Sequence, residues 1–204
     1  MAARTHSVDP RAERVRTRLR EAAFALAHER QVDQMTVGDI VARASVSRQA
    51  FYQHFTDRDD AVATAFTVAF AAATADTAVG GDARARILRL FDFAAEHRSM
   101  YRNIVPSAVT QRVVTAFRAE LQPACLEIAE QGMPLVSPVA GLTPESVSRF
   151  LVGGFMEVLR SWMESPDPTD LSGRVAAALD TVNALLGLTT HFGLTTHSKG
   201  PQHG

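Results

Sequence analysis

The chain has 204 residues, 46% of them hydrophobic, which is enough for one large domain or two smaller ones with a substantial core. Its formal net charge of −1 excludes a strongly basic protein, so a nucleic-acid binder of this composition must concentrate its positive charge locally. With a single cysteine no internal disulfide can form, and neither a signal peptide nor an apolar run of about 20 residues is found. We therefore expect a cytoplasmic protein with no membrane partner.

Positive charge is concentrated at the amino end. Residues 1–10 are polar and are expected to form a disordered arm. From Arg11 apolar residues recur at spacings of three and four, which predicts a helix. Two interpretations of the charge stay open: attraction to DNA phosphates, or a solvated helix face that pairs with Glu13 and Glu21. The arginines in question are Arg4, Arg11, Arg14, Arg16, Arg18 and Arg20.

The next stretch contains the start and stop signals of two short helices joined by a tight turn. Thr36 and Asp39 match the capping-box pattern of a helix N-terminus. A turn at residues 44–46 follows, and Ser47 is placed to cap a second helix that reaches about Phe55. Two short helices joined by about three residues are typical of a helix-turn-helix, in which the second helix enters a DNA major groove.

The rest of the sequence is also predicted to be helical. Asp57 is placed to cap a long helix that stops at Gly80 and Gly81. Pro123 is expected to kink a later helix, and residues 132–142 are expected to be a loop. Because no segment has strand alternation, the chain is predicted to be all-α, with about nine helices. The helices expected after Gly81 cover residues 82–97, 100–105, 109–132, 144–165 and 171–188.

Several segments together carry a family resemblance: Ala22, Ala23 and Leu26, then Thr36–Ile40, Ala44–Ser47, Phe51–Phe55 and Asp57–Arg58. In these residues the chain resembles the TetR/AcrR family of bacterial transcriptional repressors, over about 50 residues at the amino end. Beyond them it is similar only in the order and length of the helices. The family usually has glycine where Ser45 stands, because the turn favours a positive φ, and a smaller alanine where Val41 stands.

The resemblance implies a domain organisation and a DNA-binding mode. It implies a three-helix helix-turn-helix domain at residues 11–57, a helical effector-binding and dimerisation bundle at residues 58–188, and a disordered tail at residues 189–204. As a homodimer the protein would place two recognition helices about 34 Å apart on a palindromic double-stranded DNA operator. The implied DNA-binding residues are Thr36, Val37, Ser47, Arg48, Gln49, Ala50, Tyr52, Gln53, His54 and Arg58.

These residues have different implied roles. Arg48 has the geometry to read a guanine edge, Gln49 could pair with adenine, and Ala50 could touch a thymine methyl. Tyr52 and His54 resemble the family's phosphate contacts, although either could be part of an ordinary solvent-exposed helix face.

Backbone contacts are implied at two further positions. Thr36 would give its hydroxyl and its N–H to a phosphate, and Arg58 stands where a lysine usually clamps the DNA backbone.

The family's usual dimer interface is formed by the last two long helices. Gly153 and Gly154 lie in the middle of one of them, where glycine disfavours a helix but allows close approach across the dimer or inside one subunit. On the other helix a stripe of near-heptad spacing suits an interface. The stripe consists of Leu171, Val175, Leu179, Val182 and Leu186.

The implied effector pocket is apolar. Large side chains lie on the helices that enclose the family's pocket, and collectively they suggest an apolar or aromatic small molecule, although each could be ordinary core. They are Phe70, Phe91, Phe117, Phe155, Met156 and Trp162. Effector binding would shift the protein toward a conformer that does not fit the operator, with the helix from Arg58 to Thr77 as the lever.

Other interpretations are weighed against this one. No Walker loop, GxSxG, HExxH or dinucleotide fingerprint is found, so an enzyme is not expected, and neither is a cofactor or a metal. Cys125 is expected to be a core residue rather than a redox sensor. The tail repeats the sequence GLTTH at residues 187–191 and 193–197, which leaves a histidine-based metal site as an alternative to disorder. A TetR-like regulator controlled by a protein partner, or an activator without an effector, is the remaining alternative.

Overall fold

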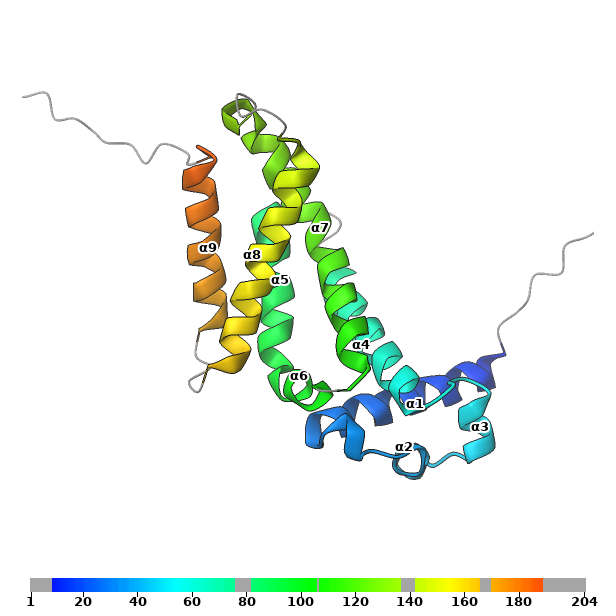
Figure 1. Ribbon diagram of the computed structural model, residues 1–204. Coiled ribbons are helices and arrows are strands. Elements are labelled where there is room, and N and C mark those ends of the chain that lie inside the picture. Colours follow the sequence, from blue (N-terminus) through cyan, green and yellow to red (C-terminus); the bar gives the residue numbers. More distant parts are fainter. Residues whose placement is uncertain (1–8, 76–81, 106, 137–141, 166–169, 189–204) are drawn as a thin grey trace, which may run out of the picture.

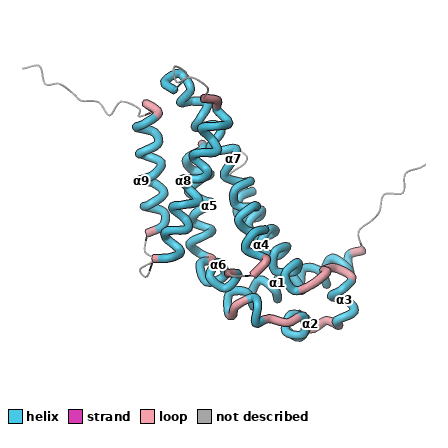
Figure 2. The backbone as a smooth tube through the Cα atoms, viewed as in Figure 1, coloured by secondary structure: helices cyan, strands magenta, loops and turns pink. Residues whose placement is uncertain are grey.

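The computed structural model describes residues 9–75, 82–105, 107–136, 142–165 and 170–188, and over these residues it contains helices and no strands (Figures 1 and 2). A small head at one end contains α1–α3, and a long bundle of α4–α9 rises from it (Figure 1). The elements are α1 (Pro10–Glu29), η1 (Val32–Gln34), α2 (Val37–Ala44), α3 (Arg48–Tyr52), α4 (Arg58–Ala75), α5 (Ala83–Glu96), α6 (Arg98–Ile104), α7 (Val109–Val136), α8 (Pro144–Glu164) and α9 (Leu171–Leu185).

The caps predicted in the head are confirmed. Asp39 N donates to Thr36 Oγ1 at 3.2 Å, and Thr36 N donates to Asp39 Oδ2 at 2.8 Å, which completes the capping box of α2. Ala50 N donates to Ser47 Oγ at 3.1 Å at the start of α3. Caps of this kind each stabilise a helix by about 1 kcal/mol. The capping hydrogen bonds therefore define where α2 and α3 begin.

Ser45 ends α2 in the left-handed region, with φ 53° and ψ 51°. Only glycine adopts this conformation without strain, and a side chain costs about 1 kcal/mol there. The Ser45 carbonyl accepts a hydrogen bond from Arg18 Nη2 of α1 at 3.4 Å. The positive φ expected from the family pattern is thus present without glycine.

The head and the bundle share one continuous hydrophobic core. The helix α4 has buried residues on most of its sides because it contacts α1 in the head and α5 and α7 in the bundle. Phe66 and Phe70 of α4 are fully buried, and Phe70 stacks on Phe117 of α7 with ring centroids 5.3 Å apart. Cys125 is also buried, and burial raises the pKa of its thiol to about 12, as expected for a core residue.

Some predicted boundaries are wrong. The loop expected from residue 132 begins later, because α7 continues through Pro134 to Val136. Gly132 is buried there, and a Cβ on it would lie 3.0 Å from Leu186 at the end of α9. Gly132 therefore allows α9 to pack closely against α7, and it does not end the helix as predicted. Gly80, Gly81 and the tail histidines His191 and His197 lie outside the described residues.

Candidate DNA-binding surface and effector cavity

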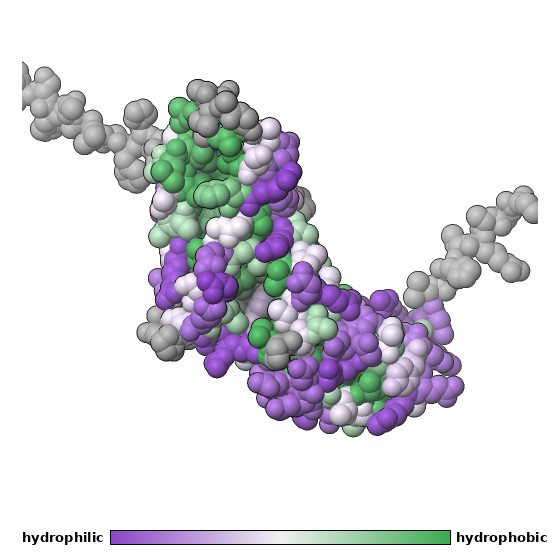
Figure 3. Space-filling model, in the orientation of Figure 1, coloured by the Kyte–Doolittle hydropathy of each residue, from purple (hydrophilic) through white to green (hydrophobic). Residues whose placement is uncertain are grey.

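The helix-turn-helix presents a polar face to solvent. Phe51 and Phe55 are buried in the head, whereas Tyr52 is 59% exposed. The described residues of the head form a largely hydrophilic surface, in contrast to the upper end of the bundle (Figure 3). Of the predicted DNA-binding residues, those exposed are Thr36, Ser47, Arg48, Gln49, Tyr52 and Gln53, and those half-buried are Val37, Ala50, His54 and Arg58.

The recognition helix is shorter than predicted. Helical geometry ends at Tyr52, and Gln53 and His54 follow in a tight turn in which His54 N donates to Phe51 O at 2.9 Å. Tightening of the last turn in this way is common at helix ends. It brings Phe55 into the core, because Phe55 N also bonds Phe51 O, at 3.0 Å. Gln53 and His54 therefore belong to the turn rather than to the helix.

Gly38 is a positioning residue that the motif alone did not reveal. A Cβ at Gly38 would lie 2.9 Å from Nη2 of Arg48 and 3.2 Å from Oγ1 of Thr36. The guanidinium of Arg48 therefore packs on the bare backbone of α2. The sequence signal for this contact was a glycine in the first turn of a short amphipathic helix. Glycine is unfavourable in a helix, and no turn at this position requires it.

Thr36 and Arg58, two of the predicted backbone contacts, are both hydrogen-bonded within the protein in this DNA-free structure. Both the hydroxyl and the N–H of Thr36 donate to Asp39 Oδ2, at 2.7 and 2.8 Å, so neither donor is free for a phosphate. These two hydrogen bonds also lower the pKa of Asp39. Arg58 Nη1 donates to the carbonyls of Asp33 and Met35, both at 3.0 Å.

Arg58 also forms ion pairs with Asp59 at 2.8 Å and with Asp33 at 3.5 Å. Its fork therefore joins the start of α4 to η1. Arginine suits this position because its planar donors reach several acceptors at once. The side chain joins two elements of the head, and its predicted role as a DNA clamp stays a prediction.

The arginines of the first helix differ in their surroundings. Arg20 pairs with Glu13 at 3.3 Å and donates to Thr17 Oγ1 at 2.9 Å, so it belongs to a solvated helix face. The arginines of α1 whose side chains are exposed are Arg11, Arg14, Arg16 and Arg18, and Arg4 lies outside the described residues. Positive charge is thus available along the first half of α1.

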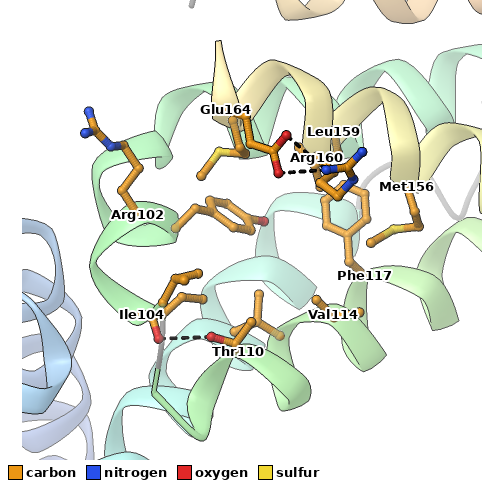
Figure 4. Close-up of a pocket in the computed structure, with 13 residues that line it drawn as sticks. Arg102, Ile104, Thr110, Val114, Phe117, Met156, Leu159, Arg160 and Glu164 are labelled. Atoms are coloured by element: carbon orange, nitrogen blue, oxygen red, sulfur yellow. Dashed lines mark hydrogen bonds and ion pairs between the residues drawn. The ribbon is translucent and has the colours of Figure 1, made fainter. Parts of the chain in front are cut away.

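The bundle contains a cavity of about 390 Å³ between α6, α7 and α8 (Figure 4). Its volume lies at the small end of the range for ligand pockets. Phe117, Met156 and Leu159 form apolar walls, and Arg160 and Glu164 of α8 pair with each other at its edge. Of the predicted pocket residues Phe117 and Met156 line it. The others, Phe70, Phe91, Phe155 and Trp162, are buried in the core.

The predicted dimer residues separate into two groups. Gly153 and Gly154 are exposed on α8, and a Cβ on either would meet nothing within 4 Å. The stripe on α9 instead packs inside the protomer, because Leu171, Val175, Leu179 and Leu186 are buried. Val182 is half-buried against the same core. In the protomer, the stripe therefore packs against the protein's own core, and its predicted part in a dimer interface stays a prediction.

Comparisons with known proteins agree with the fold. Residues 19–63 match the model of the bacterial regulatory proteins of the tetR family. A search of curated protein sequences finds no match.

Solved structures share the fold at low identity. The dihydroxyacetone kinase operon activator DhaS superposes with a TM-score of 0.66 at 16% identity, over 87% of this chain and 98% of its own. A TetR transcriptional regulator from Streptococcus agalactiae gives 0.61 at 15% identity, over 84% and 95%. The fatty acid degradation regulator FadR from Bacillus halodurans gives 0.60 at 17% identity, over 88% and 96%.

Proposed function

We propose that this chain, a TetR-family DNA-binding transcription regulator, is a homodimeric repressor that binds a palindromic operator and is released by a small apolar effector. The observation that carries the DNA-binding part is the exposed face of α3. Arg48, Gln49 and Tyr52 are exposed there, with the end of Arg48 against Gly38. Phe51 packs into the head from the other side of the helix. A short helix held in this way supports major-groove reading.

The DNA-binding proposal is tested by operator selection and point variants. Operators are selected from a random DNA pool, and affinity is measured by fluorescence anisotropy at several salt concentrations. Arg48→Ala is expected to weaken specific binding by about 1–3 kcal/mol and to relax selection at one base pair. Tyr52→Phe is expected to weaken binding to all sequences alike, since it removes a phosphate donor.

Arg118→Ala is the matched control, because it removes the same charge from an exposed position on α7. Equal losses in Arg48→Ala and Arg118→Ala would contradict the assignment of α3. Enrichment of sites without two-fold symmetry would contradict the dimeric reading.

A homodimer is supported by the exposed sides of α8 and α9. Phe150 is 79% exposed and Leu185 is 78% exposed, and the upper end of the bundle has a large hydrophobic surface (Figure 3). Contiguous exposed apolar surface of this kind marks interaction sites. Gly153 and Gly154 lie within one turn of Phe150 and would allow a partner helix to approach closely.

Release by an effector is supported by the position of α6. This helix lines the cavity with Ile104 and also contacts the head, where Asn103 Nδ2 donates to Ala27 O at 2.9 Å and to His28 O at 3.1 Å. Those carbonyls end α1. A molecule that moves α6 would therefore move α1 as well, in addition to the expected route through α4.

An activator is the second candidate, because one protein of similar fold is named an operon activator. In-vitro transcription from a promoter that carries the selected operator separates the two. Reduced transcript on adding the protein is the expected result, and increased transcript would establish activation.

A further inference from the structure

The cavity between α6, α7 and α8 contains a buried donor that has no partner among the described residues. Tyr101 of α6 lines the cavity and is only 7% exposed, and its hydroxyl makes no hydrogen bond within the described part of the chain. Burial raises the pKa of Tyr101, so the group stays a neutral donor. The hydroxyl oxygen has almost no exposed surface, so an acceptor in the cavity would reach it only after a small shift of the lining side chains. Because a buried hydroxyl without a partner is unfavourable, such an acceptor would form a hydrogen bond that replaces none to water.

The other polar groups that line the cavity are bonded within the protein, with the exception of Arg102. Thr110 Oγ1 donates to Ile104 O at 2.9 Å (Figure 4). Arg160 donates to Glu164 at 2.7 and 2.9 Å and to Glu157 at 2.8 Å, so two carboxylates neutralise its charge. The guanidinium of Arg102 points away from Phe117 and Met156 (Figure 4). Apart from Arg102, whose side chain is exposed, the described residues that line the cavity offer an anion no unpaired cation.

From this arrangement we infer that the effector is an uncharged, mainly hydrophobic molecule that carries one hydrogen-bond acceptor, a carbonyl or ether oxygen, bound by Tyr101. The inference rests on the proposed effector function and specifies its ligand class. Phe117, Met156 and Leu159 would cover the hydrophobic part of the molecule, and a carboxylate in the same place would lose its hydration without gaining a counter-charge. A hydrocarbon without an acceptor would leave the Tyr101 hydroxyl unpaired.

The test compares matched probes. Three 2-substituted naphthalenes of nearly equal shape are used: 2-acetonaphthone with a carbonyl acceptor, 2-isopropenylnaphthalene without one, and 2-naphthoate as the anion. The same triplet is made on biphenyl and on cyclohexyl scaffolds, so that the result does not depend on one ring system. Binding to the full chain is followed by melting temperature and by titration calorimetry.

The expected order in the wild-type protein is ketone, then hydrocarbon, then carboxylate. Tyr101→Phe is expected to weaken the ketone by about tenfold and to leave the hydrocarbon unchanged, since only one hydrogen bond is lost. Without any probe, Tyr101→Phe is expected to be at least as stable as the wild type, because it removes an unpaired buried hydroxyl. Thr110→Val is the control, because its hydroxyl is already bonded, and it should affect the ketone and the hydrocarbon alike.

The outcomes separate this inference from the proposed function. Equal binding of ketone and hydrocarbon, tighter binding of the carboxylate, or a ketone affinity unchanged by Tyr101→Phe would overturn the ligand class while leaving an effector site in place. No binding by any of the nine probes would overturn the ligand class and the effector arm of the proposed function together. Operator release is measured separately by anisotropy, and binding without release would contradict only the regulatory role of the cavity.

Discussion

Arg48 depends on its neighbour Gly38 for its position. A Cβ added to Gly38 would lie only 2.9 Å from Nη2 of Arg48, too close for both to keep their positions. Because the nearest atoms belong to the end of a flexible side chain, an alanine can be accommodated if Arg48 moves. We therefore propose that α2 positions the predicted base-reading side chain, and that a change at Gly38 would alter DNA binding without touching DNA.

Gly38→Ala should therefore separate stability from DNA binding. Alanine favours a helix over glycine by up to about 1 kcal/mol, so the melting temperature is expected to stay the same or rise. Operator affinity is expected to fall, since Arg48 loses its position. Thermal melts and anisotropy with the selected operator measure the two effects. In the control, Thr115→Ala, the changed residue is exposed on α7, outside the head and outside the proposed dimer surface, and operator affinity should not change. A Gly38→Ala protein with unchanged operator affinity would refute the positioning role.

At the scale of elements, α1 and the α5–α6 junction are joined by two histidines. His28 Nδ1 lies 2.8 Å from Phe24 O, which can only accept, so His28 donates there. In the neutral ring His28 Nε2 is then an acceptor, and His97 Nδ1 donates to it across 3.0 Å. Phe24 and Phe93 pack edge-on against His97. One extra proton can be shared by this pair, but two would place N–H groups against each other.

This pair predicts a pH dependence of stability. Burial, and then the charge of His28, lower the pKa of His97 from its ordinary value near 6.5, while Glu96 opposes the shift. The unfolded chain therefore binds a proton more readily than the folded one. The free energy of unfolding should be highest above about pH 7. It should decline as the pH falls through about 6.5 toward the lower pKa of His97 in the folded protein.

Urea unfolding between pH 8 and pH 5.5 measures the effect. His97→Gln should flatten the profile in this range, and His54→Gln, in the turn after α3, is the control that should not. A wild-type profile that is flat, or that falls toward high pH, would contradict the assignment.

Asn103 gives a second prediction at this scale. Its amide satisfies the last carbonyls of α1 from α6. Asn103→Ala is expected to lower the free energy of unfolding by about 1–2 kcal/mol, because two partly buried acceptors lose their donor. Asn183→Ala on α9 is the control. For any compound that binds the cavity, Asn103→Ala should retain the melting-temperature rise but require more compound to release DNA. Unchanged release would assign the coupling to α4 alone.

The sequence predicts local elements better than it predicts contacts between them. Thr36, Asp39 and Ser47 lie within three residues of the groups they cap, so their pattern was enough to place α2 and α3. Arg58 and Asn103 bond groups 25 and 76 residues away, and nothing local indicates such partners. The apolar stripe on α9 had the right period, but a period cannot distinguish burial in the protomer from burial against a partner.

At the scale of the whole molecule, the proposed homodimer needs a surface on which two copies pair. Because the α9 stripe packs in the protomer's own core, we place the proposed interface on the exposed sides of α8 and α9. Phe150 and Leu185 are more than three-quarters exposed there. In a two-fold dimer each contact occurs twice, so one large side chain contributes its burial energy at two symmetric places. A charge introduced at Phe150 would likewise occur at both symmetric places in the interface.

Phe150→Asp is therefore expected to convert the dimer to a monomer. Burying one phenylalanine contributes about 1.5–3 kcal/mol to association. The variant would lose this contribution at two symmetric places and would bury two aspartates there, a larger penalty than the loss of a typical interface residue. Sedimentation equilibrium measures the association constant, and circular dichroism checks that each monomer stays folded. The variant should bind an isolated half-site as the wild-type protomer does and lose the extra affinity for the full palindrome, because the second head is no longer tethered to the first.

Val68→Asp is the control, since Val68 is an exposed apolar residue on α4, away from α8 and α9. A Phe150→Asp protein that still sediments as a dimer would place the interface elsewhere, and dissociation by Val68→Asp would point to α4.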